Sequence, residues 1–281
     1  MKWKFYSLAF VAGMSILTAC SSDDNNDNDG NGNGNEIENG TILKGTITSD
    51  VTLAAGNTYK LSGEYIVEEG ATLHIEEGVK IIAVYDDIAD YILVKQGGKI
   101  NAVGTPDKPI VMTSEKEEPG AWGGIHICGR AHTNAEGGKG SSEIGGAVYG
   151  GNDDADNSGT LQYIRLEYTG FAFDEEHEAN GISFYGVGNG TIVDHCQAYK
   201  GSDDGFEFFG GSVNVSNLVA VSCSDDSFDW TEGWNGKGTN LVAYQEAEST
   251  LGYDCDCLME CDNNGSNNAA TPVAHPVLKN L

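Results

Sequence analysis

The sequence predicts an all-β protein whose body is a single-stranded, right-handed parallel β-helix, a solenoid in which each coil stacks on the one before. Three observations support this prediction. Glycine is abundant, with 39 residues in a chain of 281, and short β-branched runs alternate with turn signals. No long segment has helical periodicity. Similar segments also recur in register at the spacing of one coil, as repeat architectures require.

The chain begins with a segment typical of bacterial lipoproteins, so residues 1–19 are read as a signal peptide. Two lysines precede an apolar stretch of about 13 residues, 5–17, which is too short to span a bilayer. It ends in Leu-Thr-Ala-Cys, which resembles a lipobox and implies lipidation of Cys20. An ordinary signal peptide followed by a chance cysteine is the alternative.

Over residues 20–40, the sequence predicts a lipidated Cys20 followed by a disordered acidic tether. Ile37 is the one apolar residue after the cysteine, so the segment buries too little surface to order itself. Its first acids resemble the export signal of surface lipoproteins in Bacteroidota-type bacteria. We expect a lipid anchor in the outer membrane and exposure at the cell surface, with periplasm-facing attachment as the alternative. The β-helix domain is predicted over 41–281.

The formal net charge of −28 limits the partners of the protein. Such a surface repels nucleic acid and anionic lipid headgroups, so we expect no nucleic-acid partner. It attracts divalent cations. The lipid anchor remains the predicted contact with the membrane.

Two early segments align with an offset of 27 residues, which places Val67 over Val94. Four later segments align with offsets of 24, 22 and 31 residues, and they span 181–185, 205–209, 227–231 and 258–262. The tetrapeptide Asn-Leu-Val-Ala recurs at 217–220 and 240–243 as a second strand column. Coils this short are stable only when stacked, because none buries its own apolar face.

Alternate side chains of a strand point to opposite faces, so the later segments predict an interior and an outer wall. The predicted interior stack is Ile182, Phe206, Phe228 and Met259, beside Phe184, Phe208, Trp230 and Cys261. The predicted outer stack is Ser183, Glu207, Asp229 and Glu260. The final residues, His-Pro-Val-Leu-Lys-Asn-Leu, read as the start of a strand, and we expect the sequence to lack later coils.

Long segments of the body resemble a family of uncharacterised surface lipoproteins from Bacteroidota with pectate-lyase-like right-handed β-helices. The segments include GATLHIEEG, GAWGGIHICG, YGGNDDADNSGTLQYIRLEYTG and NGISFYGVGNGTIVDHCQAYKGSDDGFEFFGG. The resemblance covers 41–281. It implies a fold and a location, and it implies no settled activity.

Acidic residues recur one coil apart and predict a calcium site. Stacked coils lie about 4.8 Å apart, so the paired carboxylates repel unless a raised pKa, a backbone amide or a cation relieves them. Oxygen-rich clusters suit Ca²⁺, which takes six to eight oxygen ligands. The alternative is that these acids accept hydrogen bonds in their own turns. The predicted ligands are Asp203, Asp204, Glu207, Asp225, Asp226 and Asp229.

A second predicted calcium site consists of Asp154, Asp156 and Ser158, which resemble the first half of a calcium loop. Position twelve of such a loop would be Arg165, so the segment is not an EF-hand. A plain acidic turn is the alternative.

The sequence favours a non-catalytic binding or structural role that is glycan-related and calcium-stabilised, and no catalytic residue is assigned. The alternative is a calcium-dependent polysaccharide lyase or glycoside hydrolase. A lyase needs a basic side chain beside the metal, and Lys200 is the one cation next to the acids. Only two arginines exist, Arg130 and Arg165.

The aromatics Trp122, Tyr185, Phe209 and Trp234 are either a sugar-stacking platform or are covered by insertions at 131–158 and 170–180. His126 and His195 alternate with apolar neighbours and read as structural wall residues. The late cysteines at 255, 257 and 261 are able to supply one disulfide; otherwise the cysteines act as apolar fillers.

Overall fold

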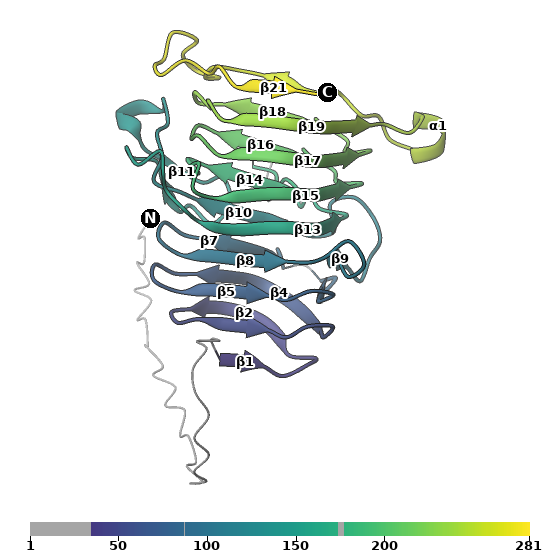
Figure 1. Cartoon of the computed structure of the whole chain (residues 1–281). Helices are drawn as coiled ribbons and strands as arrows, with labels where there is room; N and C mark the ends of the chain where they lie inside the picture. Colours follow the sequence, from purple (N-terminus) through teal and green to yellow (C-terminus); the bar gives the residue numbers. More distant parts are fainter. Residues whose placement is uncertain (1–34, 87, 174–176) are drawn as a thin grey trace, which may run out of the picture. The chain divides into compact units, whose positions relative to one another are not determined.

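The computed structural model describes residues 35–86, 88–173 and 177–281, and these wind as a right-handed parallel β-helix (Figure 1). The predicted signal peptide, Cys20 and most of the predicted tether lie outside the described residues. Within them, no helix is long and apolar enough to cross a bilayer.

Each coil contributes to three parallel faces, and the first of these carries the acidic residues. We call it the site face. It consists of the second halves of β2 (Ile42–Ile47) and β4 (Thr58–Val67), then β7 (Tyr91–Val94), β10 (Ile125–Cys128), β14 (Ile182–Tyr185), β16 (Phe206–Phe209), β18 (Phe228–Thr231) and β20 (Glu260–Cys261).

In the later coils, one long strand contributes its first half to the second face and its second half to the third face. The second face consists of β1 (Asn35–Ile37), β3 (Val51–Leu53), β5 (Thr72–Ile75), β8 (Lys99–Val103), the first halves of β13 (Gly159–Glu167), β15 (Ile192–Tyr199), β17 (Asn214–Val221) and β19 (Lys237–Tyr244), and β21 (Val277–Lys279). The third face consists of the first halves of β2 and β4, then β6 (Lys80–Ala83), β9 (Ile110–Ser114) and the second halves of β13, β15, β17 and β19.

The chain leaves the coils between β10 and β13. We call residues 131–158 the insertion loop. It contains a short 3₁₀ turn (Glu136–Gly138) and an antiparallel pair, β11 (Gly140–Ser141) and β12 (Val148–Tyr149). A single helical turn, α1 (Glu248–Leu251), projects from the later coils (Figure 1).

The stacking register read from the sequence is confirmed. Val67 pairs with Val94, and Leu73 pairs with Ile100. The later segments pair in the predicted order, 182 with 206, 206 with 228 and 229 with 260. The repeated Asn-Leu-Val-Ala segments also pair in register. The first strand begins at Asn35, before the predicted boundary at 41, because its backbone pairs with Val51–Leu53.

The interior is a continuous apolar stack. Phe184 lies over Phe208 with ring centroids 5.1 Å apart, and Phe206 lies over Phe228 at 5.6 Å. The prediction of a buried Cys261 is wrong, because its thiol lies on the last short strand of the site face and is exposed. Met259 is only partly buried at the same end of the core.

A ladder of amides holds the bend between the second and third faces. Asn217 and Asn240 adopt positive φ values of 54° and 57° at this bend, a conformation that asparagine tolerates better than most residues. Asn240 Nδ2 donates to Asn217 Oδ1 at 2.8 Å, and Asn217 Nδ2 donates to Asp194 Oδ1 at 2.7 Å. The bend therefore repeats from coil to coil.

Asp90 is a buried carboxyl that precedes β7. It is 1% exposed, its Oδ1 accepts the amide of Gly63, and its Oδ2 has no hydrogen-bond partner. Burial raises the pKa of Asp90 to about 6, and the charges of Asp86 and Glu115 add to the rise, against the effect of the Gly63 amide.

We expect Asp90 to lower the stability of the wild type as the pH rises from about 4 to about 6. The carboxyl of the unfolded chain ionises at a lower pH than the carboxyl of the folded chain, because burial raises the folded pKa. The free energy of unfolding therefore falls across this window, by at most about 3 kcal/mol. The free energy of unfolding of Asp90→Asn, relative to wild type, should rise by up to that amount between pH 4 and pH 7. Chemical denaturation at several pH values measures it. Exposed Asp107→Asn is the control, and parallel curves for wild type and Asp90→Asn would contradict the assignment.

Candidate functional site

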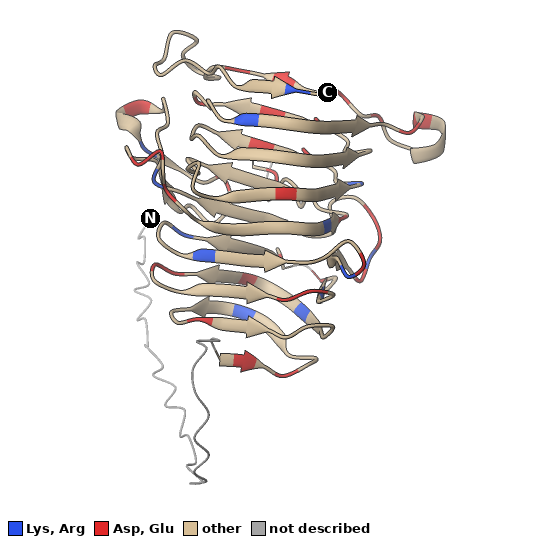
Figure 2. Ribbon diagram, viewed as in Figure 1, with Lys and Arg blue, Asp and Glu red and all other residues tan. Residues whose placement is uncertain are grey.

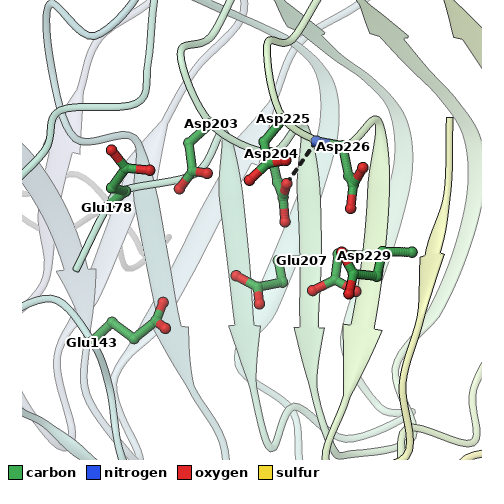
Figure 3. A pocket seen from close by; sticks show the side chains of 9 residues that line it. Glu143, Glu178, Asp203, Asp204, Glu207, Asp225, Asp226 and Asp229 are labelled. Carbon is green, nitrogen blue, oxygen red and sulfur yellow. Dashed lines mark hydrogen bonds between the residues drawn. The ribbon is translucent and has the colours of Figure 1, made fainter. Parts of the chain in front are cut away.

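An acidic cavity of about 220 Å³ lies against the outer side of the site face. We use the name acidic cavity for the space lined by nine residues, all of them acidic: Glu143, Glu178, Asp203, Asp204, Glu207, Asp225, Asp226, Asp229 and Glu260 (Figure 3). All six acids that the sequence predicted as ligands at Asp203 to Asp229 are therefore brought together. Lys and Arg are sparse along the ribbon, in keeping with the net charge of −28 (Figure 2).

The two Ser-Asp-Asp segments form successive turns that enter β16 and β18. The amide of Gly205 donates to the carbonyl of Asp226 at 2.9 Å, which joins one turn to the next. Gly205 is required at this point, because a Cβ atom would lie 2.7 Å from the carbonyl oxygen of Ser227. In the strands that follow, Glu207 pairs with Asp229 in register.

Two of the acids accept hydrogen bonds from backbone amides. This agrees in part with the alternative that these acids stabilise turns rather than bind a metal. Asp204 Oδ1 accepts the amide of Asp226 at 2.9 Å, and Asp226 Oδ1 accepts the amide of Cys257 at 2.9 Å. Both bonds run to the next coil rather than within one turn. Each uses one oxygen of its carboxylate, so the second oxygen of Asp204 and of Asp226 remains for other interactions.

The carboxyls resist ionisation where they lie. Burial raises the pKa of Asp203 to about 7, and the charges of Glu178 and Asp225 add to the rise. Burial also raises the pKa of Glu143 and of Asp226 to about 7. The concentration of negative charge is therefore costly to the folded chain, and each like charge nearby increases the cost.

Glu207 and Asp229 act as one carboxyl pair. Burial raises the pKa of Glu207 well above its usual value and that of Asp229 to about 6, and a hydrogen bond between them favours the protonated form of Glu207. Asn180 Nδ2 donates to Glu207 Oε2. Asp229 Oδ1 is wholly buried and has no hydrogen-bond partner. The pair therefore binds a proton more readily than an isolated carboxyl does, and one of its oxygens is left unsatisfied.

The insertion loop forms part of the wall of the cavity. Its Glu143 lines the cavity and accepts a hydrogen bond from Tyr185 Oη at 3.4 Å. The loop is held to the coils by Glu232, whose Oε2 accepts from Thr133 Oγ1 at 2.6 Å and from Tyr149 Oη at 2.8 Å.

The aromatic side chains do not form a sugar-stacking platform, so that alternative is wrong. Trp122 and Trp234 are buried in the main core. Tyr185 and Phe209 stack on each other at 4.4 Å outside the coil, and Tyr149 of the insertion loop packs on Tyr185 at 5.2 Å. The insertion loop therefore covers these rings, as the other interpretation expected.

The cations near the acids are engaged elsewhere. Lys200 Nζ pairs with Glu246 at 3.0 Å, Arg130 pairs with Glu69 at 2.6 Å, and Arg165 pairs with Glu167 at 2.5 Å. None of these cations lines the acidic cavity. The described residues that line the cavity include no lysine, arginine or histidine. His177 lies close enough to Glu143 to lower the pKa of that carboxyl, but it is not among the lining residues.

The second predicted calcium site has other partners in the structure. Asp154 Oδ1 lies 2.7 Å from His132 Nδ1, and Asp156 Oδ2 accepts from Ser158 Oγ at 3.1 Å. Within the described part of the chain, groups of three or more metal-binding side chains occur at the acidic cavity and do not include these residues. A calcium role for Asp154, Asp156 and Ser158 stays a prediction.

The remaining reactive side chains are structural. His126 is fully buried, and burial lowers its pKa to about 4. His195 stacks on Tyr163 at 4.5 Å, its Nδ1 lies 2.8 Å from Asp194 Oδ2, and it does not line the acidic cavity. All six described cysteines are free thiols, and those at 128, 196 and 223 are buried, so they fill space as the second interpretation of the cysteines expected.

Three cavity residues were not assigned to the site from the sequence. Glu260 was placed on the correct stack but not among the ligands, although its pairing with Asp229 in register would have indicated it. Glu143 and Glu178 lie on segments outside the repeating coils. No periodic signal marks either residue, because their positions depend on how these segments return to the site face.

The sequence matches the family described as a pectate-lyase-like β-helix domain over residues 45–281, a range that includes every residue of the acidic cavity. The chain belongs to this family. The pectate-lyase-like β-helix predicted from the sequence is thereby confirmed. No curated protein and no solved structure matches the chain. Membership of the pectate-lyase-like β-helix family identifies the fold and leaves ligand and activity open.

We expect Glu207→Gln to stabilise the metal-free protein at pH 8. The amide keeps an oxygen to accept from Asn180. At pH 8 the carboxyl of the unfolded chain is ionised, whereas burial and the neighbouring acids raise the pKa of Glu207 in the folded cavity, so the folded carboxyl either takes up a proton or keeps an unfavourable charge. The amide avoids both penalties. The unfolding temperature in chelator should rise by at least about 2 °C, the effect of roughly 1 kcal/mol in a domain of this length. Exposed Glu136→Gln is the matched control. A lower unfolding temperature for Glu207→Gln would show that the carboxylate stabilises the fold by itself.

Proposed function

We propose that this protein is a non-catalytic β-helix module whose acidic cavity binds calcium, and that the bound ion stabilises the site face. The supporting observation is the grouping of carboxylate oxygens at the cavity. Single oxygens of Asp204, Glu207 and Asp229 all lie within 4.8 Å of one another. That spacing suits Ca²⁺, whose oxygen ligands lie at about 2.3–2.6 Å.

The charge of the cavity supports a cation of this kind. All nine lining residues are acidic. Two carboxylates 4 Å apart repel by about 4 kcal/mol at an effective dielectric constant of 20. A divalent cation between the carboxylates attracts both of them. It also supplies a partner for Asp229 Oδ1, which has no hydrogen-bond partner. Calcium binding is therefore the simplest way for so many acids to be accommodated in one place.

The wider role proposed for the module is attachment at the cell surface with a glycan-related binding or structural task. The lipobox-like end at Cys20 and the acidic tether support the lipid anchor and the outer-membrane location. The link to polysaccharide is an analogy with the pectate lyases after which the family is described. The burial of Tyr185 and Phe209 removes the aromatic argument for direct sugar stacking. The calcium-binding part of the proposal is therefore the part with the most support.

A polysaccharide lyase or glycoside hydrolase is the second candidate, and the Glu207–Asp229 pair favours it. Burial raises the pKa of Glu207 well above its usual value and that of Asp229 to about 6. Two neighbouring carboxyls whose pKa values differ are what acid–base catalysis on sugars requires. The described residues that line the cavity include no base of the kind a lyase uses. We therefore rank the binding module first.

We expect calcium to raise the unfolding temperature of the wild type and chelator to reverse the rise. Binding only to the folded state contributes about 2.7 kcal/mol when free calcium is 100-fold above Kd. The rise should be strongly reduced in Asp229→Asn, which replaces a ligand carboxylate. Thermal melts with calcium and with chelator measure it.

Two further variants separate the predicted sites. Asp107→Asn is an exposed matched control and should retain the full calcium response. Asp154→Asn should also retain it if the acidic cavity is the site. The calcium proposal fails if the wild type melts at the same temperature in calcium and in chelator.

We expect no turnover of polysaccharides by the purified protein. The measurement is release of reducing ends, and of unsaturated products by absorbance, from neutral and anionic polysaccharides at pH 5 to 8 with calcium. Turnover that is lost in Glu207→Gln would replace the binding module with the hydrolase or lyase.

A further inference from the structure

The carboxylates of the acidic cavity fall into two groups that share one residue. Asp203, Asp204 and Asp225 form the first group, and Asp204, Glu207 and Asp229 form the second. Within each group, one ligand oxygen from each residue lies within 4.8 Å of the others. Two oxygens bound to the same calcium ion are at most about 5 Å apart, twice the metal–oxygen distance. Each group therefore has the size of a single ion site.

We infer that the acidic cavity binds two divalent cations, one in each group, and that Asp204 bridges them. The inference rests on the proposed function, because it presumes that the cavity binds calcium at all. It adds the number of ions, their separate ligands and the residue that links them.

Each group contains a carboxylate with few hydrogen-bond partners, and this residue is partly buried in the second group and buried in the first. In the second group, Asp229 Oδ1 is wholly buried without a hydrogen-bond partner. In the first group, Asp203 is 9% exposed, and among the described residues the neighbouring amide of Asp204 is the group that hydrogen-bonds its carboxylate. In Figure 3, Asp204 lies between Asp203 and Asp229, so the two carboxylates face the cavity from different sides of the bridging residue.

The orientation of Asp204 suits a bridge. Asp204 is nearly buried, at 6% exposure, and its Oδ1 accepts the amide of Asp226 at 2.9 Å. This bond fixes the plane of the carboxylate, and Oδ1 keeps a second lone pair while Oδ2 remains for the other ion. A carboxylate held in this way is able to offer one oxygen to each group.

The charge balance also favours two ions over one. The two groups together contain five carboxylates, so they carry −5 when ionised. One divalent cation leaves a net charge of −3, and two leave −1. The four other acids of the cavity add to the negative charge around them. A single ion would leave one group with its repulsion unrelieved.

The test counts calcium ions bound to the full-length protein by equilibrium dialysis with elemental analysis. The expected result is two ions per wild-type chain. Asp225→Asn alters only the first group and Glu207→Gln only the second, so each variant should retain one ion and lose at least tenfold in affinity for the other. Asp204→Asn should weaken both sites at least tenfold. Exposed Asp107→Asn should retain two ions.

The outcomes distinguish this inference from the proposed function. One ion per wild-type chain overturns the inference and leaves calcium binding in place, whereas no bound ion overturns both. If Asp225→Asn and Glu207→Gln each lost both ions, the cavity would be a single joint site. That result would also overturn the inference of two separate ions. Circular dichroism checks that each variant is folded. If a variant is unfolded, the number of ions bound per wild-type chain decides the inference.

Discussion

The structure depends on in-register stacking of coils at the spacing of one hydrogen-bonded strand pair, about 4.8 Å. Every residue of a coil then meets its equivalent on the coils before and after it. For apolar residues this is favourable, and Phe206 over Phe228 is an example. For charged residues the same geometry forces like charges together. The aromatic core and the acidic cavity are therefore two consequences of one constraint.

Both consequences occur on the same strands. In β16 and β18, Phe206 and Phe228 point into the core, and the next residues, Glu207 and Asp229, point into the cavity. The apolar stack fixes the register, so the acids have little freedom to move apart. Because the packing stabilises the strands, the fold tolerates a cluster of carboxyls that would otherwise disrupt them. A fixed arrangement of carboxylate oxygens follows from this rigidity.

Periodicity explains how much of this was predictable from the sequence. The stacks of Val67 on Val94 and of Glu207 on Asp229 follow from repeat spacing and side-chain alternation, and the structure confirms them. The contribution of Glu143 was not predictable, because it lies on the insertion loop. The position of such a loop is set by non-local contacts such as that between Tyr149 and Glu232. The burial of Tyr185 was undecided for the same reason, since its cover comes from the same loop.

The insertion loop changes the surroundings of the carboxylates on the site face. A row of carboxylates on a bare β-helix face would be surrounded by water, and its charges would be strongly screened. Here Glu232 anchors the loop through Thr133 and Tyr149, and Glu143 adds a carboxyl from the loop itself. Burial then strengthens every electrostatic interaction in the cavity, both the repulsion between acids and the attraction for a cation. The repeat supplies the carboxylates, and the interruption of the repeat gives them the buried surroundings that favour the proposed binding of an ion.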